Sequence, residues 1–104
     1  MKNNIKKLDY GLAEILSLNP VTYQLNSDKE NKIHLGLIAQ EVQKLVPEVV
    51  GEDNGDDHML YMRYGELLPV LIKATQEQQT LIDQQNQQIQ SLQLLVESLI
   101  QKKQ

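Results

Sequence analysis

Residues 33–50, which read IHLGLIAQEVQKLVPEVV, decide the fold of the first half of the chain. The apolar run from Ile33 to Leu37 predicts a strand, and Ala39–Leu45 predicts a short amphipathic helix. Pro47 should end that helix, because proline has no backbone N–H to donate within it. Val49 and Val50 then begin another strand. Short strands that alternate with short helices indicate an α+β fold.

The residues before this stretch predict a helix and the first strand of a hairpin. A helix that begins at Leu8 or Asp9 should end before Pro20. Residues 21–25 alternate and are rich in β-forming side chains, so they predict a strand. The polar segment 26–32 should join that strand to the one at Ile33 as a hairpin.

The residues after this stretch predict a second hairpin and the start of a long helix. Residues 49–50 and 59–61 should pair around an acidic segment. Its carboxylates are Glu52, Asp53, Asp56 and Asp57. They lack the spacing of a calcium-binding loop, which indicates a solvated turn. The long helix should start between Tyr64 and Glu66, because Pro69 is tolerated only in a first helical turn.

The last third of the chain changes in composition and carries a heptad pattern. Glycine and proline are absent after residue 75, and glutamine is the commonest residue. Apolar residues nevertheless recur in alternating steps of three and four, as in a coiled coil. Position a falls at Thr75, Ile82, Ile89 and Val96, and position d falls at Leu71, Gln78, Gln85, Leu92 and Leu99. A narrow stripe of this kind is stabilised by packing against other helices, which predicts oligomerisation through this face.

The pattern leaves the number of helices in the assembly open. β-branched residues at a with Leu at d favour a parallel dimer, whereas Gln78 and Gln85 at d complicate that preference. Buried amides specify register and oligomeric state at some cost in stability. Dimer and trimer both fit, and a further possibility is that the stripe packs on the first 70 residues of the same chain.

The composition argues against several classes of ligand. The net charge is −4 and no basic stripe exists, so nucleic acid is not an expected partner. No apolar run approaches the roughly 20 residues of a membrane helix, and residues 1–7 lack the features of a signal peptide. The chain has no cysteine, no glycine-rich phosphate loop and no metal-ligand motif. We therefore expect a soluble protein without metal, cofactor or membrane partner.

The residues by themselves indicate no convincing catalytic nucleophile. The serines are Ser17, Ser27, Ser91 and Ser98, and none lies in a Gly-x-Ser-x-Gly elbow. A triad of one of these with His34 or His58 is therefore not favoured. His34 could be a base or a ligand, but a single histidine at a strand end is more often structural. Gln40 and Glu41 follow in the first turn of the next helix, where Glu is favourable against the helix dipole.

Five short motifs, taken in order, resemble one known family. They are Lys2-Asn3-Asn4-Ile5, Leu18-Asn19-Pro20-Val21-Thr22-Tyr23, Gly36 to Val42, Pro47-Glu48-Val49-Val50 and Tyr61 to Leu68. In this order and spacing they resemble the C-terminal chaperone domain of phage endosialidases and tail spikes. That family consists of intramolecular chaperones that trimerise a fibre protein and then cut themselves off it.

The resemblance implies a fold, a partner and a setting. The implied fold is a mainly helical α+β protein, with a head of helices and hairpins over residues 1–64 and a long helix over residues 65–104 that forms a trimeric coiled coil. The implied partners are further copies of the chain, as a homotrimer, and the fibre or spike region upstream in the same polypeptide. The setting would be virion assembly in the bacterial cytoplasm, or a prophage-derived surface fibre protein.

The resemblance also implies self-cleavage by a serine and a lysine. In the family, a Ser opens a Ser-Asp-x-Arg-Leu-Lys motif and attacks the peptide bond before itself, with the Lys as general base. Lys2 corresponds to that lysine, and His34, Gln40 and Glu41 are candidate supporting residues. The Ser, Asp and Arg would precede Met1, so the chain as given is not expected to cleave. The alternative reading is a non-catalytic coiled-coil oligomerisation or adaptor module.

Overall fold

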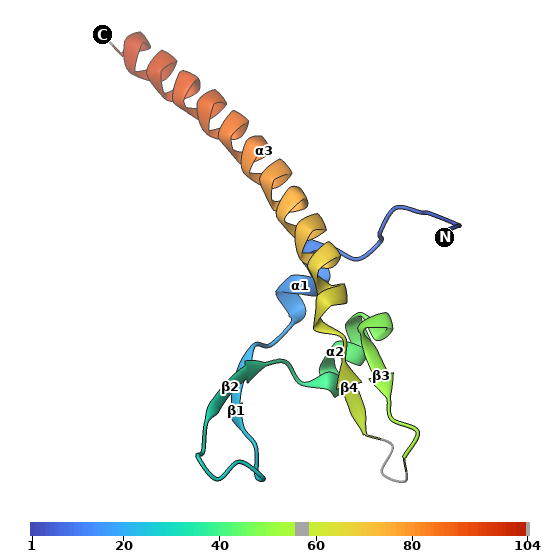
Figure 1. The fold of residues 1–104 in the computed structure, drawn as a ribbon. Coiled ribbons are helices and arrows are strands. Elements are labelled where there is room, and N and C mark those ends of the chain that lie inside the picture. Colours follow the sequence, from blue (N-terminus) through green and yellow to red (C-terminus); the bar gives the residue numbers. More distant parts are fainter. Residues whose placement is uncertain (56–58, 104) are drawn as a thin grey trace.

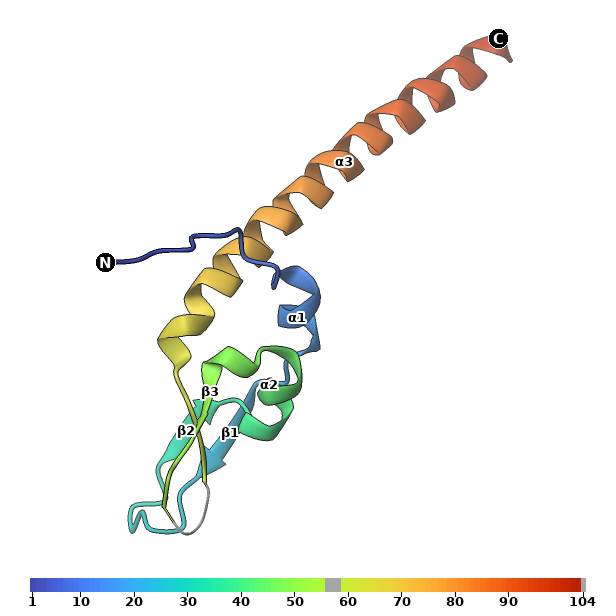
Figure 2. The same cartoon turned by 90° about the vertical axis from the view of Figure 1, so that its right-hand side faces the viewer.

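The protein is extended, with a small head at one end of a long helix (Figures 1 and 2). The computed structural model describes residues 1–55 and 59–103. Its principal extents are 78 × 43 × 21 Å, and its radius of gyration is 22.1 Å. A compact domain of this length would have a radius of gyration of about 13 Å. The long helix, which projects well beyond the head, accounts for the difference.

The elements confirm the predicted class, a mainly helical α+β chain with hairpins and short helices before one long helix. In chain order they are α1 (Leu12–Ser17), β1 (Val21–Gln24), β2 (Ile33–Gly36), α2 (Ala39–Leu45), the 3₁₀ turn η1 (Pro47–Val49), β3 (Val50–Glu52), β4 (Leu60–Met62), the 3₁₀ turn η2 (Tyr64–Glu66) and α3 (Leu67–Lys102). The predicted bounds of α2 and the helix-ending role of Pro47 are both confirmed.

Two antiparallel hairpins supply the strands. In the first, β1 pairs with β2 so that Tyr23 lies opposite His34. In the second, β3 pairs with β4 so that Gly51 lies opposite Tyr61. Both pairings were predicted from the alternating segments, and both hairpins point away from α3 in Figure 1.

The strands of the first hairpin are each one residue shorter than predicted, because the neighbouring backbone groups have other partners. β1 stops before Leu25, whose carbonyl accepts a hydrogen bond from the N–H of Asp28 in a tight turn. β2 stops before Leu37, whose N–H donates to the hydroxyl of Tyr64 over 3.2 Å. The strands of the second hairpin are shifted toward the C-terminus, to Val50–Glu52 and Leu60–Met62. Val49 belongs to η1 rather than to the second hairpin.

Helix α1 begins later than predicted. We expected a start at Leu8 or Asp9, whereas the first helical residue is Leu12. The backbone before it is held by α3 instead, since Lys73 donates to the carbonyl of Leu8 and Glu77 accepts from the N–H of Leu12. These contacts between distant residues override the local preference for a longer helix.

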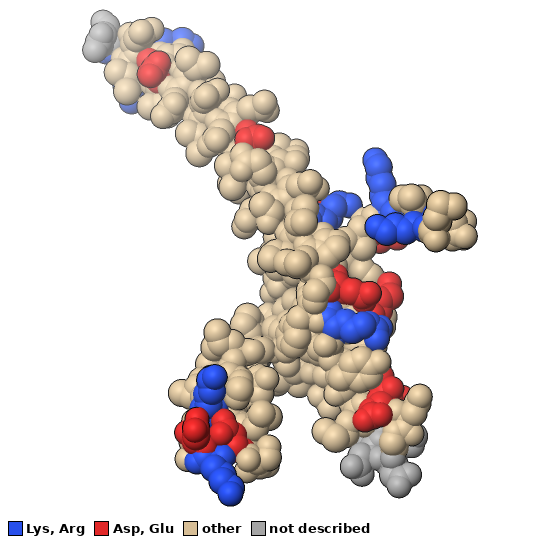
Figure 3. All heavy atoms as spheres, viewed as in Figure 1, with Lys and Arg blue, Asp and Glu red and all other residues tan. Residues whose placement is uncertain are grey.

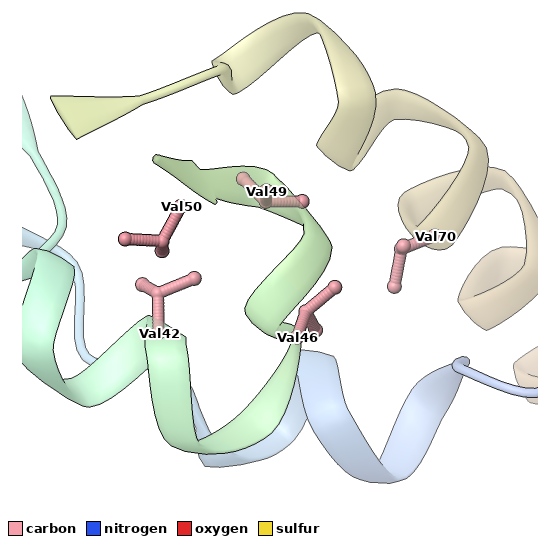
Figure 4. Packing of buried hydrophobic residues seen from close by; sticks show 5 residues of the cluster. All are labelled: Val42, Val46, Val49, Val50 and Val70. Carbon is pink, nitrogen blue, oxygen red and sulfur yellow. The ribbon is translucent and has the colours of Figure 1, made fainter. Parts of the chain in front are cut away.

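The core of the head is built from valines. Val42, Val46 and Val49 are at most 2% exposed, and Val50 and Val70 complete the buried cluster (Figure 4). Val42 lies in α2, Val50 in β3 and Val70 in α3, so the first turns of the long helix close the core. The chain has no Phe or Trp, so the buried cluster itself is aliphatic and small, with Tyr10 as an aromatic residue packed against it.

Helix α3 starts close to its predicted position. The turn η2 leads directly into α3 at Leu67, and Pro69 lies in the first turn, where its missing N–H costs no hydrogen bond. Helix α1 packs beside these first turns, as both ribbon views show.

Beyond the head, α3 is not covered by any other part of the chain that the structure describes. Val70 and Ala74 are buried, whereas every residue from Thr75 to Lys103 is exposed. The possibility that the heptad stripe packs on the first 70 residues is therefore wrong. The head is too small to reach beyond the first turns of the helix.

Candidate functional site

The heptad face of α3 is an uncovered apolar stripe. The exposed fraction of its apolar residues ranges from 42% for Ile82 to 60% for Leu92 and Leu99. Leu68, which is 59% exposed, occupies the next a position toward the head and extends the stripe to the start of the helix. The polar d positions Gln78 and Gln85 interrupt the stripe near its middle.

The stripe is wider than the a and d positions alone. Leu81 and Leu95 occupy g positions, Ile72 and Ile100 occupy e positions, and all four are exposed. Residues 84–96 carry no charge, and the face of α3 visible in Figure 3 has few charged side chains. A helix with so broad an apolar surface can bury it against more than one neighbouring helix.

Lys2 lies in an extended and exposed N-terminal segment. Every residue from Met1 to Lys7 is exposed, and Asn4 adopts a left-handed backbone with φ of 52°. In Figures 1 and 2 this segment runs away from the hairpins and α2. In a single chain, therefore, Lys2 is not brought to the other candidate residues.

The candidate supporting residues lie on two different elements of the head. His34 lies in β2, where its ring stacks on Tyr23 with centroids 5.3 Å apart. Its Nε2 atom is buried, has no hydrogen-bond partner among the described residues, and is 4.0 Å from a carboxylate oxygen of Asp28. Gln40 and Glu41 lie exposed in the first turn of α2. Their role at a cleavage site stays a prediction.

A contact between α3 and the N-terminal segment could not be predicted from sequence patterns. Lys73 Nζ donates to the carbonyl of Leu8 over 2.7 Å, and Glu77 Oε1 accepts from the N–H of Leu12 over 3.0 Å. We call these two contacts the α3 clamp. Lys73 and Glu77 are four residues apart, a spacing that in the sequence resembles an ordinary ion pair on a helix surface.

A second polar cluster links the start of the head to η1 and η2. The Tyr10 hydroxyl donates a hydrogen bond to the Glu48 carboxylate over 2.7 Å. This hydrogen bond is the main reason why the pKa of Tyr10 is raised above its usual value. The guanidinium of Arg63 donates to the Glu48 carbonyl over 2.8 Å and to the Glu66 carboxylate over 3.3 Å. These contacts tie Tyr10 to the segments on either side of the second hairpin.

The acidic segment and the second histidine fall partly outside the described residues. Glu52 and Asp53 lie at the end of β3, whereas Asp56, Asp57 and His58 are outside the described part of the chain. Within residues 1–55 and 59–103, no group of His, Cys, Asp and Glu side chains is arranged to hold a metal ion. Over the same residues, no helix is both long and apolar enough to cross a membrane.

Comparison with known proteins identifies the first half of the chain. The sequence model of a family described as chaperone of endosialidase matches residues 1–51. Four of the five motifs quoted above lie within these residues, and the motif from Tyr61 to Leu68 lies beyond them. No curated protein matches the chain.

Proposed function

Because the chain belongs to the chaperone of endosialidase family, we propose that it is the trimerisation and chaperone module of a phage tail-fibre or tail-spike-like protein. Helix α3 brings three copies into register, and the fibre region upstream in the same polypeptide folds on that template. Self-cleavage then separates the module, residues 1–64 and the long helix 65–104 together, from the fibre.

The observation that carries this proposal is the uncovered stripe on α3. A helix of this kind is only marginally stable alone in water, and burial of its apolar face against other helices supplies the missing stabilisation. A coiled coil at the end of a fibre also raises the effective concentration of the chains and fixes their register. The oligomerisation residues are Leu71, Gln78, Ile82, Gln85, Ile89, Leu92, Val96 and Leu99.

The width of the stripe favours three helices over two. A dimer buries mainly a and d, whereas each helix of a trimer packs between two neighbours and covers more of e and g. The exposed Leu81 and Leu95 at g and Ile72 and Ile100 at e fit the second arrangement. The amides of Gln78 and Gln85 would then meet near the axis, where they fix the register.

The cleavage chemistry would use Lys2 as the general base. The hydroxyl of an upstream serine attacks the carbonyl carbon of the peptide bond before it, so that a C–O bond forms and the C–N bond breaks. Lys2 takes the hydroxyl proton and returns it to the departing serine nitrogen, and water then hydrolyses the ester. Lys2 must be neutral to act, which requires a less exposed environment than in the single chain.

Two measurements on the protein with its upstream region restored test this proposal. Sedimentation equilibrium should give a trimer, and the intact mass should show two fragments, the smaller beginning at a serine five residues before Lys2. The matched variant Lys2→Ala should assemble equally well and stay uncut. A monomer or a dimer would contradict the proposed trimer, and a Lys2→Ala variant that still cuts would contradict the role of Lys2.

A second candidate function is favoured by the exposure of Lys2 in the single chain. In this reading the chain is a non-catalytic coiled-coil oligomerisation or adaptor module that keeps the family fold but does not cut. An assembled trimer whose wild-type chain keeps its full mass would support this candidate and exclude self-cleavage.

A further inference from the structure

The α3 clamp joins two parts of the chain that are far apart in the sequence. Lys73 and Glu77 each bind a backbone atom of a residue 65 positions away, Leu8 and Leu12 respectively. Contacts to backbone atoms fix the path of the chain itself and not merely the orientation of a side chain. The first turns of α3 therefore hold residues 8–12, from which the N-terminal segment leads back to Lys2.

Gly11 makes this close approach feasible. It is buried, and a Cβ atom at this position would collide with the Glu77 carboxylate and lie 3.2 Å from Cγ of Lys73. Its N–H donates to Glu14 over 2.6 Å, so the carboxylates of Glu14 and Glu77 both accept from the start of α1. Two acceptors at this end of α1 are favourable, because the first N–H groups of a helix lack partners within it.

The clamp and the heptad stripe occupy opposite faces of the same helical turns. In the heptad register Lys73 is at f and Glu77 is at c, whereas Leu71 and Gln78 are at d and Thr75 is at a. The turns that begin the stripe are thus the turns that hold residues 8–12. When copies assemble through the stripe, residues 8–12 of each copy therefore lie on the face of α3 that the stripe does not use.

We propose that Lys73 and Glu77 are positioning residues. They fix the path of the N-terminal segment, so that self-cleavage depends on a folded and assembled α3. The inference rests on the proposed function. Without partners the first turns of α3 are less stable, the clamp opens more often, and Lys2 and the serine before it lose their fixed geometry. Assembly stabilises those turns, and cleavage follows assembly in time.

The test uses the full chain with its upstream region and compares variants that change only the clamp. Glu77→Ala removes the acceptor for Leu12, Lys73→Met removes the donor to Leu8, and Glu77→Gln keeps an oxygen acceptor of the same size. Glu97→Ala, on the same helix but far from the head, is the matched control. The readouts are the first-order rate of cleavage and the oligomeric state by sedimentation.

We expect Glu77→Ala and Lys73→Met to assemble normally but to cleave at least about tenfold more slowly, since misplacement of reacting groups by about 1 Å can cost roughly a hundredfold in rate. Glu77→Gln should recover most of the rate, and Glu97→Ala should match the wild type. Hydrogen exchange at the Leu12 amide should be faster in assembled Glu77→Ala than in the wild type.

Three results would overturn the inference. If assembled Glu77→Ala and Lys73→Met cleaved at the wild-type rate, the two residues would have no positioning role, and the proposed function would stand. Unchanged Leu12 exchange in Glu77→Ala would mean that the contact does not form. A wild-type chain that assembles but stays uncut, like Lys2→Ala, would remove the proposed cleavage itself and this inference with it.

Discussion

The head and the long helix differ in whether the chain itself buries their apolar side chains. The head buries Val42, Val46 and Val49 almost completely within one chain, whereas every residue from Thr75 to Lys103 is exposed. Both segments are rich in aliphatic residues, so hydrophobic content alone does not separate them. The difference lies in the path of the chain. The short elements of the head fold back on one another, whereas a straight helix does not fold back on itself.

This difference indicates where each region obtains its stability. The head has an internal core, although a small one, and short hairpins of its size need such packing to persist. Helix α3 has its backbone hydrogen bonds but lacks a partner for its apolar face, and those bonds alone give a helix little net stability in water. The chain therefore combines a region that folds on itself with a helix whose apolar face the described part of the chain leaves uncovered.

The largest expected effect is the loss of assembly in Ile89→Asp. This change places a carboxylate in the middle of the stripe, where burial of an unpaired charge is strongly unfavourable. We expect monomers at micromolar concentration and a large loss of helical circular dichroism. Leu94→Asp is the matched control, because Leu94 lies at an f position and should keep the assembly. An assembled Ile89→Asp variant would mean that the heptad register is wrong.

The next largest effect is a loss of stability in the head, which two spectroscopic signals distinguish from unfolding of α3. All four tyrosines lie before α3, so tyrosine signals report the head, whereas circular dichroism at 222 nm reports mainly α3. Val46→Ala should destabilise the head by roughly 2 kcal/mol, through lost burial and a small cavity. The tyrosine transition should shift to lower temperature while the oligomer persists. Equal shifts of both signals would indicate one cooperative unit and contradict the contrast between the regions.

A smaller loss of stability is expected from a larger side chain at Gly36, where the first hairpin meets η2. In Gly36→Val, the Cβ atom would lie 2.8 Å from the Tyr64 hydroxyl and 3.0 Å from the Tyr23 ring. Gly36 does not have a positive φ, so the constraint is the space beside it and not its backbone conformation. We expect a loss of about 1–3 kcal/mol in thermal unfolding. Gly65→Ala is the control, since no atom of the described residues lies within 4 Å of a Cβ there, and an equal loss in both would contradict this explanation.

The smallest effect concerns the hydrogen bond from Tyr10 to Glu48. Tyr10→Phe should lower the stability of the head slightly and leave the helix signal unchanged. Because the folded state raises the pKa of Tyr10, this contribution is fully present below the ordinary tyrosine pKa and is lost as the pH rises through the raised value. Urea unfolding at neutral pH and at high pH checks both parts. A wild-type advantage that grew at high pH would show that the sign is wrong.

Much of the fold follows from local patterns in the sequence. The hairpins, the helix Ala39–Leu45 and the start of the long helix near Pro69 were predicted, because alternation, periodicity and proline act over a few residues. The heptad stripe is equally visible, since it is a property of one helix. The late start of α1 was missed, because the residues that prevent an earlier start lie in α3.

The sequence by itself determined the element types, the apolar stripe and the family motifs, since each is written in neighbouring residues. Only the tertiary structure decided that the stripe is left uncovered and that Lys73 and Glu77 hold the backbone at Leu8 and Leu12. It also decided that Gly36 is needed for space beside Tyr64 and Tyr23. These features depend on which distant segments meet, and no local periodicity encodes a contact across 65 residues.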